Sequence, residues 1–587
     1  MPKSRTVHRL RWALAVTVAA AVVLVGYTGH QALQAKHNLE LVAGDFTTLG
    51  GQLKSGDQPA ARVTLAAAQR HAGHAAANTR GPGWWLTSRI PGVRANIVAV
   101  RTVAQVSDRL SRDVLPDVVR ATAALAPANL RPVGGQVDLD RVEAATPGVV
   151  RADRRLRGLS HTVQDMDAND LAPQIAVPVR RMQRELRSAT DLSHRASLAV
   201  RLLPPMLGSQ GGRHYLLVVQ NNAELRSTGG IPGAFATVTA NGGKVSIDAH
   251  WNAKGLESFS RPVLPLSTQE QSLFGDRLGR YPQDVNLTPS FPRSAQLISA
   301  MWRERNRQRV DGVLSVDPVA LSYVLGGAGP ARLQDGTQLT AGNAVDLLLN
   351  RVYAQVGVDQ QNAFFGRVAA TAFQAVSAGQ GQPKAVLDGL AHAVAQRRLL
   401  VWSAHPAEQS LIAPTRLGGS LAARGRTTPH VGVFLDDGTG DKLGYYLRYG
   451  VHVTAARCQA GRQYLTVAVR LRSAVPADSN GLPDYVAENA VGLERGMLRT
   501  SVMVYAPAGG YFRTTTDDGS SDSFERLEHL GRQVARVTVD LAPGRTRSLT
   551  YEVVTGRGQV ARTSLQVTPG AQSTPVGTVG PAATCGS

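Results

Sequence analysis

The hydrophobic periodicity of the chain changes along its length, and each change restricts what the next segment can fold into. Residues 30–205 carry apolar residues at spacings of three and four, which is typical of amphipathic helices that pack on one another. Residues 206–428 mix short apolar runs with helical patterns, which indicates an α/β domain. Residues 429–567 contain alternating runs at short, regular spacing, which predicts a C-terminal β-sandwich of immunoglobulin type. The fold class we expect is therefore α/β plus all-β, followed by a disordered, Gly-, Pro-, Ser- and Thr-rich tail over residues 568–587.

The N-terminus contains one long apolar segment, WALAVTVAAAVVLVGYTG, Trp12–Gly29. As a helix it would span about 27 Å, close to the hydrocarbon thickness of a bilayer. The preceding residues, 1–11, are basic and would stay in the cytoplasm. We therefore expect a transmembrane helix at 12–29, a helical membrane-proximal region, and a single-pass protein of the cell membrane whose bulk is extracytoplasmic. A signal peptide cleaved after Ala35 is the alternative.

The chain is strongly basic, with a formal net charge of +21. Nearly all of this charge is arginine, because lysine stands at only seven positions, the last of them Lys442. A positive field favours polyanionic partners. Nucleic acid is not expected, because the arginines are scattered and aromatic residues make up only 5% of the chain. The patterns of a P-loop, a nucleophile elbow and a His-Glu-x-x-His metalloprotease are all absent from the sequence.

Only two cysteines occur, Cys458 and Cys585. In an oxidising compartment they could form a disulfide that ties the C-terminus to a strand of the last domain. Two separate thiols are the alternative.

A cluster of polar residues, NNAELRSTGG, follows the apolar run HYLLVVQ. If the strand continues through this cluster, Asn222, Glu224 and Arg226 share one face. Such a face is costly in a core without partners, so it predicts either a ligand site or an internal Glu224–Arg226 pair that orders a loop. Gly229 and Gly230 would allow a positive φ or a close approach of two backbones.

The segment NNAELRSTGGIPGAFATVTANGGKVSI resembles the signature of the domain of unknown function 4012 family of bacterial envelope proteins. NLTPSFPRSAQLISAMW, VDGVLSVDPVALSYVLGGAGP and LTAGNAVDLLLNRVY are similar to its following motifs, and the resemblance extends over roughly Trp84 to Pro507. The order of elements also resembles, more loosely, the LytR-CpsA-Psr phosphotransferases. That likeness implies a LytR-CpsA-Psr-like α/β domain. It also implies a polyprenyl-pyrophosphate ligand with a divalent cation, and transfer of a glycopolymer. The Pro-Arg-Asp element of those enzymes is absent here, and KVSIDAHWN, Lys244–Asn252, stands in its place.

A pyrophosphate site needs fixed cations and a carboxylate that holds the metal. Arg226 is the first candidate for a phosphate fork, and Glu224 or Asp284 could hold Mg²⁺, which makes these three the candidate catalytic residues. The candidate binding residues are Asn222, Asn286, Arg351 and Arg367. The alternative for Asp284 and Asn286 is turn chemistry, and for the two later arginines an ordinary helix surface.

Three functions are compatible with these features. The first is an extracytoplasmic membrane-anchored protein that binds or assembles anionic cell-envelope glycopolymers without turnover. The second is a phosphotransferase on polyprenyl-phosphate-linked glycans, with Mg²⁺ as its cofactor. The third is a structural envelope scaffold.

Overall fold

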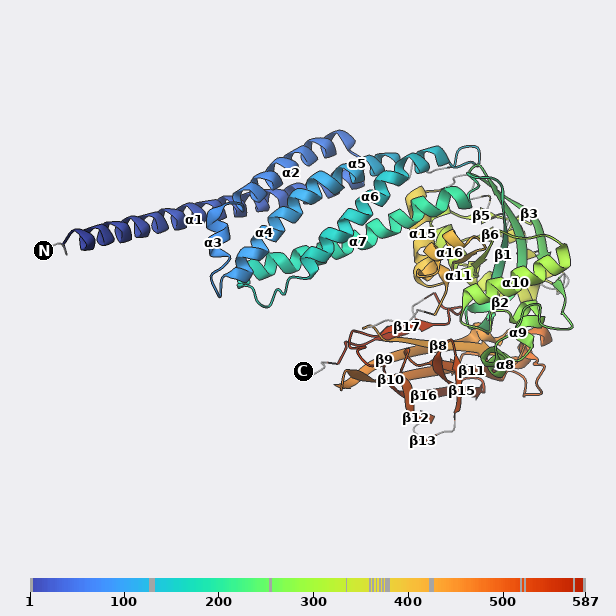
Figure 1. Cartoon of the computed structure of the whole chain (residues 1–587). Helices are drawn as coiled ribbons and strands as arrows, with labels where there is room; N and C mark the ends of the chain where they lie inside the picture. The colour runs from blue at the N-terminus through green and yellow to red at the C-terminus, as the bar shows by residue number, and fades with distance from the viewer. Residues whose placement is uncertain are drawn as a thin grey trace. The chain divides into compact units, whose positions relative to one another are not determined.

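In the computed structural model the chain forms two compact units (Figure 1). One comprises residues 1–130 and 138–205, and the other residues 131–137 and 206–587. The structure describes residues 4–583 except 126–131, 253–255, 334, 358–359, 362–363, 366, 369–370, 372–373, 375–380, 422–426, 518–519, 522–523 and 574–575. For residues 4–22, 25, 248–252, 517 and 520–521 it describes the backbone alone.

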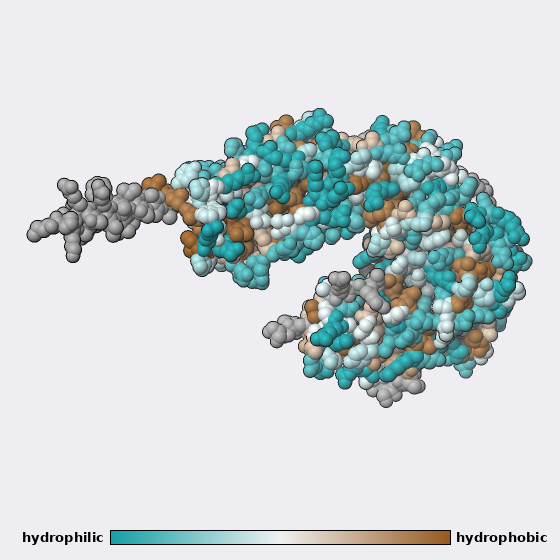
Figure 2. Space-filling model, in the orientation of Figure 1, coloured by the Kyte–Doolittle hydropathy of each residue, from teal (hydrophilic) through white to brown (hydrophobic). Residues whose placement is uncertain are grey.

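The first unit is helical, as its period of three to four predicts. Its amphipathic helices bury one side against each other, for example through Val106, Leu156 and Leu186. Figure 2 shows the visible face of this unit as mainly hydrophilic. The helices are α1 (Ser4–Ser55), α2 (Gln58–Asn78), α3 (Pro82–Thr87), α4 (Arg94–Arg109), the π-helix η1 (Leu110–Val114), α5 (Leu115–Ala124), α6 (Leu139–Gln164) and α7 (Pro173–Met206).

The transmembrane anchor predicted at Trp12–Gly29 falls within α1, and the side chains of residues 12–22 lie outside those that the structure describes. In the described part of the chain, no helix is both long enough and apolar enough to cross a membrane. Past Gly29, α1 carries charged side chains, among them a Lys36–Glu40 pair at 3.9 Å. The membrane-spanning part of the predicted fold class, and the single-pass localisation built on it, were therefore wrong for the residues described.

The second unit contains a five-stranded sheet in the order β3-β2-β1-β4-β7. β1 pairs antiparallel with β2 and parallel with β4, which is the mixed α/β arrangement that the sequence predicts. Gly242 and Gly243 have φ values of 55° and 87° and form the tight turn between β2 and β3. The strands are β1 (Arg213–Arg226), β2 (Gly229–Asn241), β3 (Lys244–Asn252), β4 (Gly312–Val316) and β7 (Leu400–Ser403).

Helices lie on both faces of this sheet. On one face Leu216 and Val218 of β1 join a core with Leu297 and Met301 of α10. On the other face lie α11, α15 and the π-helix η4. The helices of this region are α8 (Thr268–Phe274), α9 (Arg277–Arg280), η3 (Pro282–Asp284), α10 (Phe291–Asn306), α11 (Pro318–Ala328), α12 (Ala344–Asp346), η4 (Leu347–Arg351), α13 (Val352–Gln355), α15 (Pro383–Ala395), α16 (Pro406–Ile412) and η5 (Arg416–Gly418). The short strands β5 (Ala331–Arg332) and β6 (Gln338–Leu339) pair with each other.

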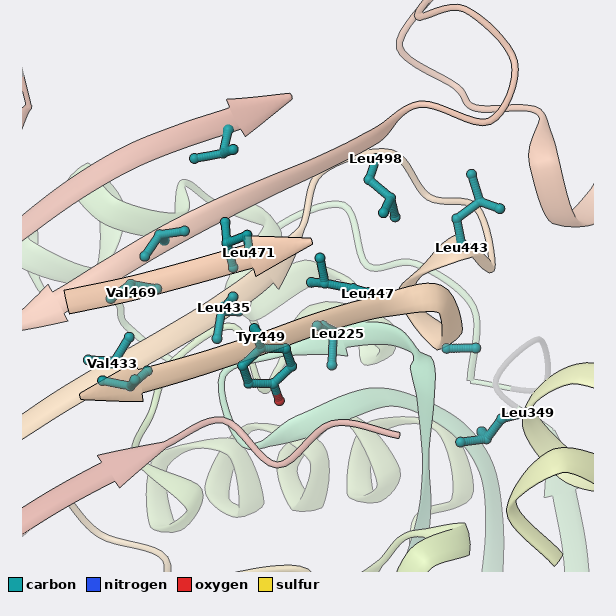
Figure 3. Close-up of a cluster of buried hydrophobic side chains, with 14 of the residues drawn as sticks. Leu225, Leu349, Val433, Leu435, Leu443, Leu447, Tyr449, Val469, Leu471 and Leu498 are labelled. Carbon is teal, nitrogen blue, oxygen red and sulfur yellow. The ribbon is translucent and has the colours of Figure 1, made fainter. Parts of the chain in front are cut away.

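Two further sheets hold one hydrophobic core between them, as the alternating C-terminal runs predict (Figure 3). Their orders are β13-β12-β16-β10-β9-β18 and β14-β15-β11-β8-β17. The elements are β8 (His430–Asp437), η6 (Leu443–Tyr446), β9 (Leu447–Gln459), β10 (Arg462–Ser473), η7 (Ser479–Gly481), α17 (Asp484–Ala487), β11 (Leu498–Tyr505), β12 (Tyr511–Asp517), β13 (Ser520–Ser521), β14 (Glu525–His529), β15 (Arg532–Leu541), β16 (Thr546–Val554), β17 (Ser564–Val567) and β18 (Gly577–Val579).

The core of these two sheets continues into the α/β part of the unit. Leu225, at the end of β1, and Leu349 of η4 belong to the same buried cluster as Leu435 and Leu471 of the sheets (Figure 3). The end of β1 is therefore held against β8 and η6 by apolar packing, which positions the polar residues around it.

Part of the segment predicted to be a disordered tail is ordered. β18 pairs in parallel with β9, and Thr568 donates a hydrogen bond from its hydroxyl to the carbonyl of Ser227. Cys458 is disulfide-bonded. Cys585, the other cysteine of the chain, lies outside the described residues.

Candidate functional site

A β-bulge at the end of β1 sets the directions of its polar side chains. Asn221 pairs with Ile231, but the next paired residue, Leu225, faces Gly230, so three residues of β1 have no partner in β2. Gly230 permits this crowding, since a Cβ there would lie 2.1 Å from the carbonyl oxygen of Asn221. Gly229 has a φ of 144°, so the glycine pair provides both the positive φ and the close approach of two backbones that the sequence indicates.

The bulge breaks the predicted alternation, which placed Asn222, Glu224 and Arg226 on one face. Asn221 and Glu224 line a cavity instead, while Asn222 and Arg226 do not. Strict alternation holds only for a regular strand, and the bulge shifts the side chains that follow it.

The cavity has a volume of about 1090 Å³ and lies against the face of the sheet that α11, α15 and η4 cover. Pockets for small molecules usually measure about 300–1,000 Å³, so this cavity is large for its kind. Its sheet wall is mainly apolar and includes Leu217, Val219, Ile231, Val238, Val245, Ile247, Leu314 and Val316. Leu217, Val219, Leu314 and Val316 are only half-buried although they lie in interior strands, because the helices do not pack directly on them. The helical wall includes Leu321, Val324, Leu349 and Leu390.

Polar side chains gather at one end of this cavity. The Nζ atom of Lys442 lies 2.5 Å from Oε1 of Glu224 and 4.6 Å from the centre of the Tyr485 ring. Asn221 donates a hydrogen bond from Nδ2 to the hydroxyl of Tyr353 at 2.7 Å. All five residues line the cavity, and Glu224 and Lys442 are 8% and 6% exposed. The apolar cavity therefore ends in a group of hydrogen-bonding and charged atoms, of which the Glu224–Lys442 pair is buried.

Burial and pairing act in opposite directions on these groups. Burial raises the pKa of Glu224, and the nearby Lys442 ammonium offsets this only in part. Burial alone would lower the pKa of Lys442, but the Glu224 carboxylate outweighs it and the pKa is raised. Burial also raises the pKa of Tyr353, so its hydroxyl stays protonated. Lys442 is thus a charged group whose partner is the carboxylate beside it.

Lys442 reaches the end of β1 because the chain after it passes very close to the bulge. A Cβ on Gly444 would lie 2.6 Å from the carbonyl oxygen of Ala223. The preceding turn is held by Asp437, whose carboxylate accepts hydrogen bonds from the backbone nitrogen of Gly440 and the hydroxyl of Thr439. The segment DDGTGDK, Asp436–Lys442, therefore ends β8 with a turn, and its lysine enters the site.

Arg226 forms a separate, buried ion pair. Its Nη2 atom lies 3.1 Å from Oδ1 of Asp284, whose other oxygen lies 3.2 Å from Nε of the half-exposed Arg277. Asp436 is buried nearby, accepts a hydrogen bond from Ser227, and has its pKa raised by burial to about 7. Neither Arg226 nor Asp284 lines the cavity. Arg226 and Asp284, two of the three candidate catalytic residues, contact each other, and the third, Glu224, pairs with Lys442 instead of with Arg226.

The other candidate binding residues are spread over the unit. Asn222 donates from Nδ2 to Asp317 and to the carbonyl of Pro569. Asn286 donates to the carbonyl of Gly230 at 2.6 Å, which supports the hairpin after the bulge. Arg351 pairs with Asp346 at the surface, at 2.7 Å, and Arg367 is exposed beside Phe364.

The structure does not bring the predicted metal ligands together. Glu224 and Asp284 form their ion pairs with different cations. Within the described ranges, no group of three or more His, Cys, Asp and Glu side chains is arranged to hold a metal ion. A magnesium site stays a prediction of the sequence alone.

Lys442, Tyr353 and Tyr485 were not among the sequence candidates. They lie 129 positions or more after Glu224 in the sequence, and only the fold joins them to it. One signal was available: Lys442 is one of seven lysines in an arginine-rich chain and is followed closely by a glycine, Gly444.

The molecule is thus an α/β protein with a large apolar cavity that ends in a polar cluster around the buried Glu224–Lys442 pair. Residues 210–353 match the family model described as protein of unknown function (DUF4012), which confirms the expected family resemblance for that segment. The match includes β1, the bulge and Tyr353, but not Lys442 or Tyr485. No curated protein and no solved structure is similar enough to the chain to count as a match.

Proposed function

We propose that this chain binds one amphiphilic molecule, with the hydrocarbon part in the cavity and the polar head beside Glu224 and Lys442. The observation that carries the proposal is the apolar wall of interior strands, where Leu217, Val219 and Leu314 remain half-buried. Apolar side chains in the middle of a sheet are normally covered, because leaving them in water costs free energy. A hydrocarbon ligand would cover them.

The free energy available is substantial. Each buried CH₂ group contributes about 0.8 kcal/mol, from which the cost of association must be subtracted. A lipid-linked glycan would satisfy both this proposal and the expectation of a glycopolymer ligand, since the cavity would take its lipid part. Phosphotransfer is not supported to the same degree, because Arg226, Arg351 and Arg367 do not converge on the cavity.

A length series of alkanols tests the proposal. The uncharged fluorescent probe 1-N-phenylnaphthylamine is bound to the full chain and displaced by hexanol, octanol and decanol. We expect the affinity to rise by up to about four-fold per added CH₂ group, which corresponds to about 0.8 kcal/mol.

Two variants of α15 form a matched pair for this test. Leu390 lines the cavity, whereas Leu387 on the same helix is exposed and lies outside it. Leu390→Trp should fill part of the cavity and weaken decanol binding at least ten-fold, and Leu387→Trp should leave it unchanged. An affinity that does not depend on chain length, or that Leu390→Trp leaves intact, would rule the proposal out.

A further inference from the structure

We infer that the head group recognised at the polar end of the cavity is uncharged and rich in hydroxyl groups, as in a glycosyl lipid, and is not a phosphate. This inference rests on the proposed function, since it concerns the same cavity. It is carried by the charges, the hydrogen-bonding groups and the aromatic rings that line that end.

The charges do not suit an anion. The described lining residues include three acidic side chains, Glu224, Glu257 and Asp317, and one cation, Lys442, and none of them is an arginine. A phosphate is normally held by several charge-assisted hydrogen bonds from converging cations. Here it would meet a single ammonium that already lies 2.5 Å from a buried carboxylate. Binding a phosphate would leave that carboxylate without its partner in a buried position, which is costly.

Two buried arginines of the same unit are also engaged in ion pairs. Arg226 pairs with Asp284 at 3.1 Å, and Arg398 pairs with Asp317 at 2.7 Å. Neither guanidinium group lines the cavity. They neutralise carboxylates of the protein and do not form a positive surface for a ligand.

A cationic head is disfavoured for the converse reason. Lys442 would repel it, and the Lys442 ammonium already lies over the rings of Tyr485 and Tyr353, at 4.6 and 6.0 Å. The carboxylate of Asp317 is neutralised by Arg398, and Glu257 is exposed to solvent. The polar end therefore carries little net charge.

The hydrogen-bonding groups at this end can both donate and accept hydrogen bonds, as the hydroxyl groups of a ligand can. Asn221 and Gln361 each have an amide that both donates and accepts, and the hydroxyls of Tyr353 and Tyr485 do the same. A ligand hydroxyl also donates one hydrogen bond and accepts two, so it can pair with any of these atoms. The centre of the Tyr353 ring lies 6.2 Å from that of Tyr485 and 6.5 Å from that of Phe365, and these rings offer apolar faces to the C–H groups of a sugar ring.

Four probes that share a dodecyl chain test this inference on the full-length protein. They are dodecanol, dodecyl glucoside, dodecyl phosphate and dodecyltrimethylammonium, each used below its micelle concentration at pH 7.5. We expect the glucoside to bind at least ten-fold more tightly than dodecanol, and the phosphate and the ammonium compound to bind no more tightly than dodecanol.

A pair of tyrosine variants checks that the preference arises at this end of the cavity. Tyr485→Phe should lower the ratio of glucoside to dodecanol affinity by about three-fold or more, because one hydroxyl partner is lost. Tyr445→Phe removes a hydroxyl that donates to Asp346 away from the cavity lining, and it should leave the ratio unchanged.

The outcomes separate the two proposals. If dodecyl phosphate binds most tightly, or if the glucoside gains nothing over dodecanol, the head-group inference is overturned while the proposed function stands. If none of the four dodecyl probes binds, the proposed function itself fails and the head-group inference falls with it.

Discussion

At the scale of single residues, the pair formed by Glu224 and Lys442 is the feature on which the polar end of the cavity depends. Both side chains are almost fully buried, and their charged atoms lie 2.5 Å apart. Removing one member of a buried pair typically costs about 3–5 kcal/mol, because it leaves an uncompensated charge, whereas replacing both is often tolerated.

Lys442→Met is therefore expected to lower the free energy of unfolding by about 3–5 kcal/mol at pH 8. Lys442→Met combined with Glu224→Gln should recover most of that loss. The cost of the single variant should be smaller at pH 5, because burial raises the pKa of Glu224 and a protonated carboxyl needs no cation. Urea unfolding at both pH values measures these effects. Equal costs at pH 5 and pH 8, or no recovery in the double variant, would contradict this account.

Asp436 makes the stability of the folded protein depend on pH. Burial raises its pKa from the ordinary value of 3.8 to about 7 in the folded protein. The folded state thus binds a proton more tightly than the unfolded state, so the stability contribution is fully present below about pH 4 and is lost as the pH rises through about 7. Asp436→Asn retains an acceptor for the Ser227 hydroxyl but cannot ionise.

We expect wild type to lose up to about 4 kcal/mol relative to Asp436→Asn between pH 4 and pH 8, since one pKa unit corresponds to about 1.4 kcal/mol. Taking the difference between the two proteins removes the titration of other groups, such as His529, whose pKa burial lowers to about 4. Parallel stability curves over this pH range would show that Asp436 does not titrate as described.

At the scale of elements, the bulge in β1 explains why the sequence predicted the polar cluster but not its directions. The residue types from Asn221 to Gly230 are sufficient to predict that the strand ends in a polar cluster and that two backbones approach each other closely there. The sequence does not indicate how many residues the bulge leaves unpaired, because that depends on the partner strand and on the approach of Gly444. A shift of one residue reverses every later side chain, so Glu224 and Arg226 were assigned to a common site that the fold divides.

The packing of α11 on α15 provides a direct test at the same scale. Gly327 and Gly326 are neighbours in α11, but a Cβ on Gly327 would lie 2.3 Å from the backbone nitrogen of Val386, whereas one on Gly326 would meet nothing closer than 4.0 Å. Gly327→Ala should therefore destabilise the protein by about 1–3 kcal/mol through overpacking. Gly326→Ala should be neutral or stabilise by up to about 1 kcal/mol through helix propensity.

Thermal unfolding of the two alanine variants side by side makes this comparison. A similar midpoint for both would mean that α11 and α15 do not pack as closely as described, and the helical wall of the cavity would need revision.

At the scale of the whole molecule, the C-terminal segment joins parts of the second unit that are distant in sequence. Arg398 donates to the carbonyls of Gly570 and Gln572, at 2.8 and 2.5 Å, and pairs with Asp317 at the start of α11. Arg398→Met should release this segment and leave Asp317 buried without its cation, at a cost of about 3–5 kcal/mol. Hydrogen exchange should rise first in residues 568–583. Unchanged protection there would show that Arg398 does not hold the segment.

The sequence predicted the succession of structural classes along the chain better than it predicted the contacts between distant segments. The periodicities predicted helical, α/β and β parts, because each depends on local patterns. The family resemblance was confirmed for residues 210–353 by motifs that are contiguous in sequence. The ordered part of the tail was missed because its partners, such as Ser227, lie more than 300 positions away. The cavity was missed for a related reason. A space between a sheet and its helices exists where side chains from distant segments fail to fill it, and local sequence patterns do not predict this.

The heat capacity change of ligand binding shows whether the cavity takes a hydrocarbon chain. Burial of apolar surface makes this change negative. Calorimetric titration of the full chain with hexanol, octanol and decanol at several temperatures should give a heat capacity change that becomes more negative with each added CH₂ group, and Leu390→Trp should abolish that trend. A heat capacity change near zero, or one that is the same for all three alkanols, would contradict the account.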